Sequence, residues 1–374
     1  MFERDKITDE NIKRILESFN FEGSFVGLAP HGCGHINDTF LMSFSGADGG
    51  DIKYILQRIN GGIFKNIPAL MRNFELVTAY LAEKSLKAGG NPMRDVLTLI
   101  FTRSGQSYLE TNGEYFRAFV FIDRAISYQT VEKPEHFFEA GIAFGRFAAL
   151  LDGFDASLLF EAIPNFHDTA KRYDNFLKAL EADKHSRAKD VKAEIEFTKS
   201  RRGITNAVIS LLNDNKIPKR VTHNDTKLNN VMIDDVTGKA VAVIDLDTVM
   251  PGSLLYDFGD SIRSGCNTAA EDEKDLSKVT FDLKLFAAYS KGYIKETKKL
   301  IRAEEKKLLA AAPVLMTFEC GMRFLTDYLD GDNYFKIKYP SHNLDRARTQ
   351  YKLVADMEKN ADKMAEILDS AFAE

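Results

Sequence analysis

One segment of the chain carries a histidine, an aspartate and an asparagine at a spacing suited to proton transfer beside a metal ion. Residues 221–230 read V-T-H-N-D-T-K-L-N-N, so Asp225 follows His223 by two residues and precedes Asn230 by five. An ionised carboxylate such as that of Asp225 can accept the proton of an incoming hydroxyl group. A carboxamide about one turn further on can bind a neighbouring cation through its oxygen without adding negative charge. Because this skeleton occurs by chance in roughly 1–2% of chains of this length, the interpretation needs a second motif.

An apolar strand that ends in two acids supplies that second motif. Residues 241–247 read V-A-V-I-D-L-D, which places Asp245 twenty residues after Asp225. Side chains at i and i+2 lie on the same face of a strand, so we expect the carboxylates of Asp245 and Asp247 to converge on one cation. Asn230 and Asp245, with Asp247 as a further candidate, form an oxygen-only ligand set that suits magnesium (Mg2+), with nucleotide phosphates completing the shell. The two motifs share the spacing of the kinase catalytic loop H-R-D-x-x-x-x-N and of the metal-binding aspartate that follows it.

A third acidic stretch, D-F-G at 257–259, spells the metal-binding motif of protein kinases, but no apolar strand precedes it. We therefore predict that Asp245 binds the metal. Asp257 and Asp260 are expected to act as caps and local hydrogen-bond acceptors ahead of a helix that starts near Ser261. His223 is predicted to brace the catalytic loop, residues 223–230, rather than to carry protons.

A nucleotide-binding partner for these residues is predicted in the N-terminal third of the chain. Residues 20–122 read as a five-stranded sheet with one inserted helix that opens at Pro68, and Asn112-Gly113 predicts a tight hairpin turn. Gly32 and Gly34 form a G-x-G turn between two predicted strands, where backbone N–H groups could approach phosphate oxygens. A plain hairpin turn is the alternative for this segment.

The third predicted strand lacks the lysine that kinases carry there. Gln57 stands at that position, in Y-I-L-Q-R, and is a candidate nucleotide-binding residue, whereas Arg58 points to the other face of the strand. The sequence does not indicate which side chain supplies the missing positive charge.

Beyond residue 122 the pattern is mostly helical, with one hairpin at 221–247. We predict an α+β, bilobal, protein-kinase-like fold with a small β-rich N-terminal lobe and a large helical C-terminal lobe. The predicted boundaries are a nucleotide-binding lobe at 1–118, a hinge at 119–124 and a catalytic and substrate-binding lobe at 125–374. This architecture is a fold-level hint and does not by itself define a function.

Composition excludes several other classes of protein. The 374 residues carry a net charge of −5, and no run of basic residues is free of acids, which argues against nucleic-acid binding. Three widely spaced cysteines favour neither a disulfide framework nor a zinc site. The charged start has no secretory pattern, and no apolar run approaches 18 residues. We expect a cytoplasmic monomer that does not associate with membranes.

With these motifs in place, the chain resembles the N-acetylhexosamine 1-kinases of the aminoglycoside phosphotransferase/choline kinase superfamily over about residues 24–360. The matching segments are H-G-C-G-H-I-N at 31–37, Y-I-L-Q at 54–57, L-M-R-N-x-E-L-V at 70–77, the block 221–263, and C-G-M-R-F-L at 320–325. The resemblance implies ATP- and Mg2+-dependent phosphorylation of the anomeric hydroxyl of N-acetylglucosamine or N-acetylgalactosamine, giving the α-1-phosphate.

The resemblance also implies roles for individual residues. Asp225 matches the base that contacts the substrate, and Asn230 and Asp245 match the magnesium ligands. The remaining matched positions are the substrate-binding residues His35, Arg323 and Tyr334, and the adenine-holding hinge residues Phe119, Phe121 and Asp123. Without the resemblance, Arg323 would be interpreted as a surface or ion-paired arginine and Tyr334 as a half-buried tyrosine.

Two other functions stay open at this point. The first is a kinase of the same fold with a different acceptor, such as choline, homoserine or another sugar. The second is a non-catalytic nucleotide-binding module, which the missing strand lysine would suit. The intact set of Asp225, Asn230 and Asp245 argues against the second.

Overall fold

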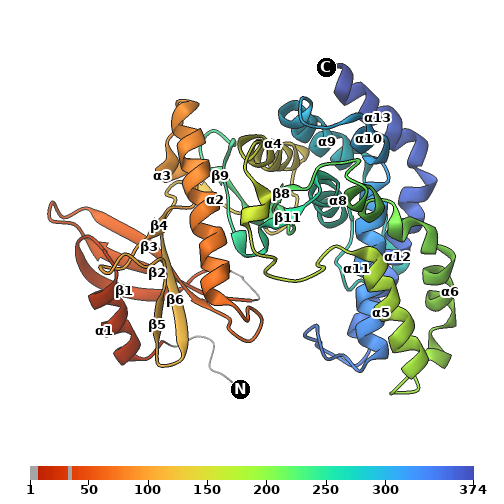
Figure 1. The fold of residues 1–374 in the computed structure, drawn as a ribbon, viewed down its shortest axis with the longest axis horizontal. Helices are drawn as coiled ribbons and strands as arrows, with labels where there is room; N and C mark the ends of the chain where they lie inside the picture. The colour runs from red at the N-terminus through yellow and green to blue at the C-terminus, as the bar shows by residue number, and fades with distance from the viewer. Residues whose placement is uncertain (1–6, 33–35) are drawn as a thin grey trace.

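The computed structural model describes residues 7–32 and 36–374. Two of the predicted site residues, Gly34 and His35, lie outside the described residues. Figure 1 shows a β-sheet region on one side of the molecule and a larger helical region on the other. The predicted α+β, kinase-like, bilobal fold is confirmed.

The N-terminal sheet contains six antiparallel strands rather than the five expected. Their order is β1-β2-β3-β6-β4, and β5 also pairs with β6. The bounds are β1 Ser24–Pro30, β2 Asp38–Ser45, β3 Asp51–Ile59, β4 Leu99–Ile100, β5 Leu109–Thr111 and β6 Glu114–Val120. The predicted turn at Asn112-Gly113 joins β5 to β6, and both of its residues have positive φ, 52° and 74°, as a type I′ turn requires.

Side chains alternate between two apolar clusters on opposite faces of this sheet. Helix α1 (Asp9–Ser18) covers one face, where its Ile15 packs with Phe40 and Leu56 of the strands. Helix α2 (Ile67–Lys87) covers the other face, where Phe74 packs with Phe119. The short helix α3 (Pro92–Asp95) follows α2 and precedes β4.

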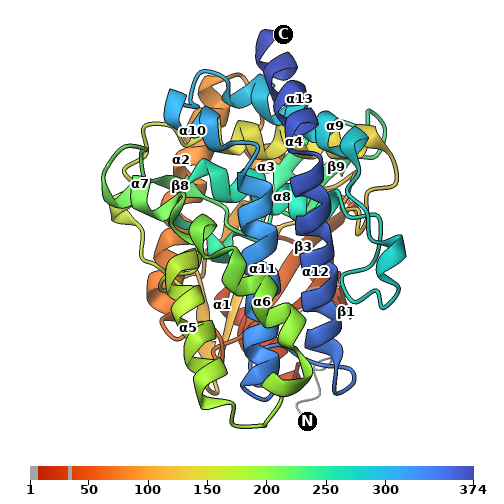
Figure 2. The ribbon, with the colours of Figure 1, turned by 90° about the vertical axis from the view of Figure 1, so that its right-hand side faces the viewer.

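The helical region is built on close helix pairs. Helices α4 (Pro134–Leu150) and α9 (Leu283–Thr297) pack tightly because glycines line their contact; a Cβ on Gly141 would lie 2.4 Å from the carbonyl oxygen of Tyr289. Helices α11 (Ala312–Leu329) and α12 (His342–Lys359) run side by side, flanked by α5 (Thr169–Ala182) and α6 (Lys192–Ser200), as Figure 2 shows. The remaining helices are α7 Ile209–Asn213, α8 Leu254–Gly265, α10 Ala303–Leu308 and α13 Ala361–Ala373, with 3-10 turns η1 Ala156–Leu158, η2 Ala188–Asp190, η3 Arg202–Asn206 and η6 Leu276–Lys278.

Short strands between the two regions carry the predicted site. The antiparallel strands β10 (Ala240–Val243), β9 (Val231–Asp234) and β7 (Ala125–Ile126) form a three-stranded sheet. Strand β8 (Arg220–Thr222) pairs with β11 (Met250–Gly252), and the 3-10 turns η4 (Leu228–Asn230) and η5 (Leu246–Thr248) complete the segment. The two pairings bring the catalytic loop next to the segment that contains Asp245. Neither residues 7–32 nor residues 36–374 contain a helix long and apolar enough to cross a membrane.

Candidate active site

The catalytic loop holds the Asp225 carboxylate at the surface between two polar neighbours. The side-chain amide of Asn230 donates to the backbone oxygen of Asp225 at 2.8 Å and to its Oδ2 at 3.3 Å. This orientation leaves Oδ1 of Asn230 available to bind a cation. The ammonium of Lys227 lies 2.7 Å from Oδ1 of Asp225, whose side chain is 26% exposed. A hydroxyl group from solvent can therefore reach the carboxylate.

His223 braces this loop, as predicted. Its Nε2 contacts the carbonyl oxygen of Ile244 at 2.9 Å, and its Nδ1 accepts the backbone N–H of Asp225 at 3.3 Å. This pair of contacts requires a neutral ring with the proton on Nε2. Burial lowers the pKa of His223, which keeps the ring neutral.

Two aspartates of α8 hold the loop from behind. The backbone N–H groups of His223 and Asn224 each donate to Asp257 at 2.8 Å, and the N–H of Thr226 donates to Asp260 at 3.1 Å. Both oxygens of Asp257 are thus occupied within a buried site, which supports Asp245 over Asp257 as the metal ligand.

The predicted start of this helix near Ser261 is wrong. Helix α8 begins at Leu254 and is capped by Ser253, whose hydroxyl accepts the N–H of Leu255. Asp257 and Asp260 therefore lie inside the helix and are not caps. They accept hydrogen bonds from the catalytic loop, which is more than 30 residues away in the chain. The contact forms because α8 packs directly behind that loop.

The two acids of the D-L-D motif do not share a strand face, contrary to expectation. Strand β10 ends at Val243, Asp245 adopts a left-handed backbone with φ of 62°, and η5 follows at once. The alternation of strand side chains therefore stops before the first acid. Asp245 is exposed at the surface although protein atoms surround its carboxylate, whereas Asp247 is buried.

The Asp245 carboxylate has the environment of a cation site. Among residues 7–32 and 36–374 it has no hydrogen-bond or ion-pair partner. Desolvation by the surrounding protein, together with repulsion from Asp247 and Asp225, raises the pKa of Asp245 to about 7. A divalent cation beside Asp245 would offset both effects.

The Asp247 carboxylate is occupied by partners from the N-terminal sheet. Arg117 of β6 forms two contacts with it, Nη1 to Oδ1 at 2.5 Å and Nη2 to Oδ2 at 2.9 Å. The side-chain amide of Asn37 donates to Oδ2 at 2.5 Å. These contacts do not favour the prediction that Asp247 binds a metal; instead they join the two regions of the molecule at the base of the site.

Arg117 also accounts for the missing strand lysine. It pairs in register with Gln57 across β3 and β6, and Nε and Nη2 donate to Oε1 of Gln57 at 3.0 and 2.8 Å. Its guanidinium lies over the rings of Phe74 and Phe119, and the side chain is 1% exposed. The positive charge thus comes from the strand next to the expected one. We refer to Arg117, Gln57, Asp247 and Asn37 as the inter-lobe cluster.

Arg58 lies on the opposite face, as its position predicts. It pairs with Asp38 and Glu114, both at 2.8 Å, within the N-terminal sheet.

Oxygen donors around Asp245 fit a hard divalent cation. No group of three or more His, Cys, Asp or Glu side chains that could hold a metal occurs in the described part of the chain. Asp245 and Oδ1 of Asn230 could therefore supply only part of a coordination shell. Mg2+ commonly takes one or two protein oxygens and completes its shell with phosphate oxygens and water, so the residues present fit a nucleotide-bound cation.

Comparison with known proteins agrees with this geometry. The model of the phosphotransferase enzyme family matches residues 28–293. The chain belongs to this phosphotransferase family. Family membership identifies the chain as a phosphotransferase, and its fold is that of aminoglycoside phosphotransferases.

Three solved structures share the fold of this phosphotransferase at low sequence identity. A microcompartment-associated aminopropanol kinase matches with a TM-score of 0.56 and 14% identity, over 96% of this chain and 99% of the other. An aminoglycoside phosphotransferase from Alicyclobacillus acidocaldarius gives 0.57 and 12%, over 98% and 97%. An amicoumacin kinase, solved with AMP-PNP and Ca2+, gives 0.53 and 12%, over 95% and 94%.

The predicted nucleotide-binding residues of the phosphotransferase have different surroundings. Gly32 is exposed and has a left-handed φ of 75°. An added Cβ would lie within 4 Å of no described atom, so it is the backbone angle that favours glycine here. Phe121 is half-buried, and its ring lies edge-on to that of His31 at 5.9 Å, so the hinge and the end of β1 face each other. Phe119, in contrast, is buried against Phe74, and the backbone oxygen of Asp123 accepts from Arg94.

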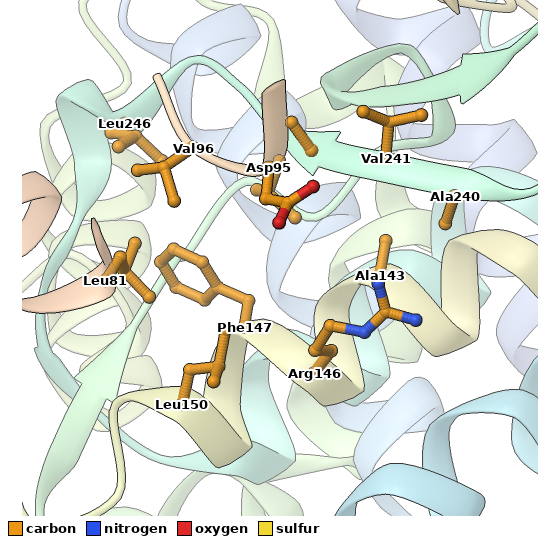
Figure 3. Close-up of a pocket in the computed structure, with 12 residues that line it drawn as sticks. Leu81, Asp95, Val96, Ala143, Arg146, Phe147, Leu150, Ala240, Val241 and Leu246 are labelled. Carbon is orange, nitrogen blue, oxygen red and sulfur yellow. The ribbon is translucent and has the colours of Figure 1, made fainter. Parts of the chain in front are cut away.

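A small cavity lies behind the D-L-D segment, between α2, α4 and β10 (Figure 3). Its volume is about 30 Å³, and its walls are mostly apolar, including Leu81, Phe147 and Leu246. Asp95 and Arg146 are its charged members, and the Asp95 carboxylate is already bonded to Ser85 and Asn91. A space of this size holds little more than one water molecule and cannot hold a nucleotide.

A larger pocket of about 500 Å³ lies between α5 and α11, and it contains both Arg323 and Tyr334. The guanidinium of Arg323 lies 5.5 Å from the ring of Phe166, 5.8 Å from that of Tyr334 and 5.4 Å from that of Phe335. The structure thus brings together the two predicted substrate residues that it describes. We call this space the α5–α11 pocket.

His167 connects the α5–α11 pocket to the catalytic loop. Its Nδ1 lies 2.9 Å from Oε1 of Glu319, one turn before Arg323 on α11, and its Nε2 lies 3.3 Å from the backbone oxygen of Asn224. The sequence alone assigns no role to His167, because neither of its partners lies near it in the chain. Lys227 was also missed, although its place two residues after Asp225 could have revealed it.

Proposed function

We propose that this protein transfers a phosphoryl group from ATP to the anomeric hydroxyl of an N-acetylhexosamine, N-acetylglucosamine or N-acetylgalactosamine, giving the α-1-phosphate. One arrangement carries the proposal: Asn230 and Lys227 hold Asp225 beside the carboxylate of Asp245, which has no hydrogen-bond or ion-pair partner among the described residues. The choice of sugar rests on the resemblance around Arg323 and Tyr334, which line one pocket of about 500 Å³.

Asp225 acts as the base in this proposal. Its exposed carboxylate accepts the proton of the sugar hydroxyl as the hydroxyl oxygen attacks the γ-phosphorus of ATP. Lys227 pairs with Asp225 and adds positive charge where the phosphoryl oxygens would lie. Burial lowers the pKa of Lys227, but the attraction of Asp225 outweighs it and raises the pKa overall, so the ammonium stays charged.

Asn230 and Asp245 would hold Mg2+, which supplies neutralisation of the nucleotide phosphates when bound. Asp247 acts indirectly in this scheme. Arg117 and Asn37 hold its carboxylate, and this contact fixes the position of η5, which begins directly after Asp245. On the nucleotide side, Gly32 offers backbone to phosphate, and Phe121 with His31 flanks the place for adenine. The remaining predicted contacts, Gly34 and His35, complete the proposed site.

The charge of the α5–α11 pocket argues against a cationic acceptor. Choline or another amino alcohol carries a positive charge and would need aromatic or acidic walls. Arg172, Lys178 and Arg323 all line this pocket. A sugar, whose hydroxyl groups accept hydrogen bonds from guanidinium groups, suits it better.

A panel of acceptors with ATP and magnesium, followed by phosphorus NMR, tests the proposal. We expect an anomeric α-phosphate from N-acetylglucosamine or N-acetylgalactosamine and no product from choline or ethanolamine. A product phosphorylated at C6, or turnover of amino alcohols alone, would contradict the proposed acceptor.

The variant Asp225→Asn tests the role of Asp225. It removes the base, so kcat should fall at least about 1,000-fold. It should keep the fold, so ATP should still bind. Asp235→Asn removes an exposed carboxylate from the nearby β9–β10 turn and is the matched control. Substantial residual turnover in the Asp225 variant would exclude it as the base.

A further inference from the structure

We propose that the α5–α11 pocket binds a negatively charged group, so that the preferred acceptor is a hexosamine bearing a carboxylate, sulfate or phosphate substituent. This inference rests on the proposed function, because it places the acceptor sugar next to Arg323. It goes beyond that function in assigning a charge to the acceptor and a binding role to Arg172.

Two arginines from different helices face the pocket, and neither has a carboxylate partner in residues 7–32 or 36–374. Among those residues, Arg172 of α5 donates only to the backbone oxygen of Phe166, from Nε at 3.4 Å and Nη2 at 3.1 Å. Arg323 of α11 contacts aromatic rings but forms no hydrogen bond or ion pair within the described residues. Lys178, one helical turn and a half beyond Arg172, adds a third cation with no ion pair in that part of the chain.

Other groups of the protein already engage the acids that line the same pocket. The Asp327 carboxylate accepts the backbone N–H groups of Asn333, Tyr334 and Phe335 and the side-chain amide of Asn343. Asp330 pairs with Lys184 at 3.1 Å. The four cations of the lining, Arg172, Lys178, Lys184 and Arg323, outnumber its two acids, so a ligand would meet a net positive charge.

The two guanidinium groups are close enough to repel each other. Desolvation and the charge of Arg323 lower the pKa of Arg172. Arginine nevertheless stays charged in proteins, so this repulsion persists until an anion arrives. Planar guanidinium groups bind carboxylate, sulfate and phosphate through paired N–H donors, which matches the proposed ligand chemistry.

The rest of the pocket suits a sugar ring. Tyr334 is 64% exposed, and Phe335 lies beside it, so an apolar sugar face can pack on these rings while its acidic substituent reaches the arginines. A volume of about 500 Å³ accommodates a substituted monosaccharide.

Steady-state kinetics with matched acceptors tests the proposal. The probes are N-acetylglucosamine, its 3-, 4- and 6-sulfates, its 6-phosphate, and N-acetylmuramic acid, which carries a carboxylate. We expect at least one acidic sugar to have a KM at least about tenfold below that of N-acetylglucosamine, as one charged hydrogen-bonded contact provides. The probes also distinguish which of the three anionic groups the pocket prefers.

Variants of Arg172 assign the effect to the pocket. Arg172→Gln should raise KM for the preferred acidic sugar at least about tenfold, and by a clearly larger factor than it raises KM for N-acetylglucosamine. Arg172→Lys keeps the charge but loses the paired N–H donors, so it should recover only part of the affinity. Lys171→Gln, which removes a neighbouring exposed charge outside the pocket, should change neither value more than about twofold.

Calorimetric titration with inorganic sulfate, without ATP, separates this proposal from the proposed function. If sulfate binds the wild type but not Arg172→Gln, and no hexosamine is phosphorylated, the anion site stands and the proposed function fails. If neutral and acidic sugars have equal KM values and Arg172→Gln changes neither, the anion site is wrong while the proposed function stands.

Discussion

Arginines occupy two regions of this protein in opposite ways. In the inter-lobe cluster, Arg117 lies over two aromatic rings and is 1% exposed, and a carboxylate and an amide oxygen accept hydrogen bonds from its donors. In the α5–α11 pocket, Arg323 also lies among aromatic rings, but no carboxylate within the described residues meets it. The side chain and its aromatic surroundings are alike. The presence or absence of a protein counter-ion therefore separates an arginine that stabilises the fold from one that is free to bind a ligand.

The largest expected effect comes from opening the inter-lobe cluster. Arg117→Met leaves the Asp247 charge buried without its main partner, so we expect a loss of about 3–5 kcal/mol in the free energy of unfolding. Urea denaturation followed by circular dichroism measures this loss.

The double variant Arg117→Met/Asp247→Asn removes both charges and should recover part of that stability. Arg58→Met, on the opposite face of the neighbouring strand, is the matched control and should cost less, because its pair is more exposed. An equal loss of unfolding free energy in Arg117→Met and Arg58→Met would contradict the view that Arg117 stabilises the fold through its buried counter-ion.

Removing an arginine from the open pocket should have an intermediate effect that depends on the anion. Arg172→Gln relieves like-charge repulsion, so in low-salt buffer without sulfate its Tm should equal or slightly exceed that of the wild type. Adding sulfate should raise the Tm of the wild type more than that of the variant, because a ligand that binds only the folded state stabilises it.

Thermal denaturation with sulfate and with chloride at matched ionic strength measures the difference. A marked loss of Tm in Arg172→Gln without sulfate would show that this arginine, like Arg117, serves the fold.

The smallest expected effect is at the ion pair between Lys184 and Asp330, which lies at the solvent-exposed edge of the same pocket. Lys184→Ala should change the free energy of unfolding by no more than about 0.2–1 kcal/mol, because exposed pairs gain little in water. Urea denaturation again provides the measurement. A larger loss would mean that this pair is part of a buried network comparable to the inter-lobe cluster.

The local geometry that was predicted correctly is the geometry that short segments encode. The catalytic loop and its bracing histidine follow from residues within a few positions of each other, and the turn at Asn112-Gly113 follows from its own two residues. The placement of Asp247 was mispredicted because the left-handed backbone at Asp245 interrupts the strand pattern, and aspartate adopts that conformation without a clear signal in the sequence.

Residues whose partners lie far away in the chain could not be identified in this way. Arg117 and Asp247 are 130 positions apart, and their contact depends on strand register and on how the two regions meet. Arg172 and Arg323 share a pocket only because α5 packs against α11. Sequence spacing carries no information about such packing.

The sequence by itself therefore determined the family-level fold, the catalytic loop and the acid that follows the hairpin, because local spacing dictates local geometry. The tertiary structure alone decided which charges are neutralised inside the protein and which remain available to a ligand. The physical reason is that a charged side chain is satisfied by whatever folding brings within about 3–4 Å of it, at any distance along the chain.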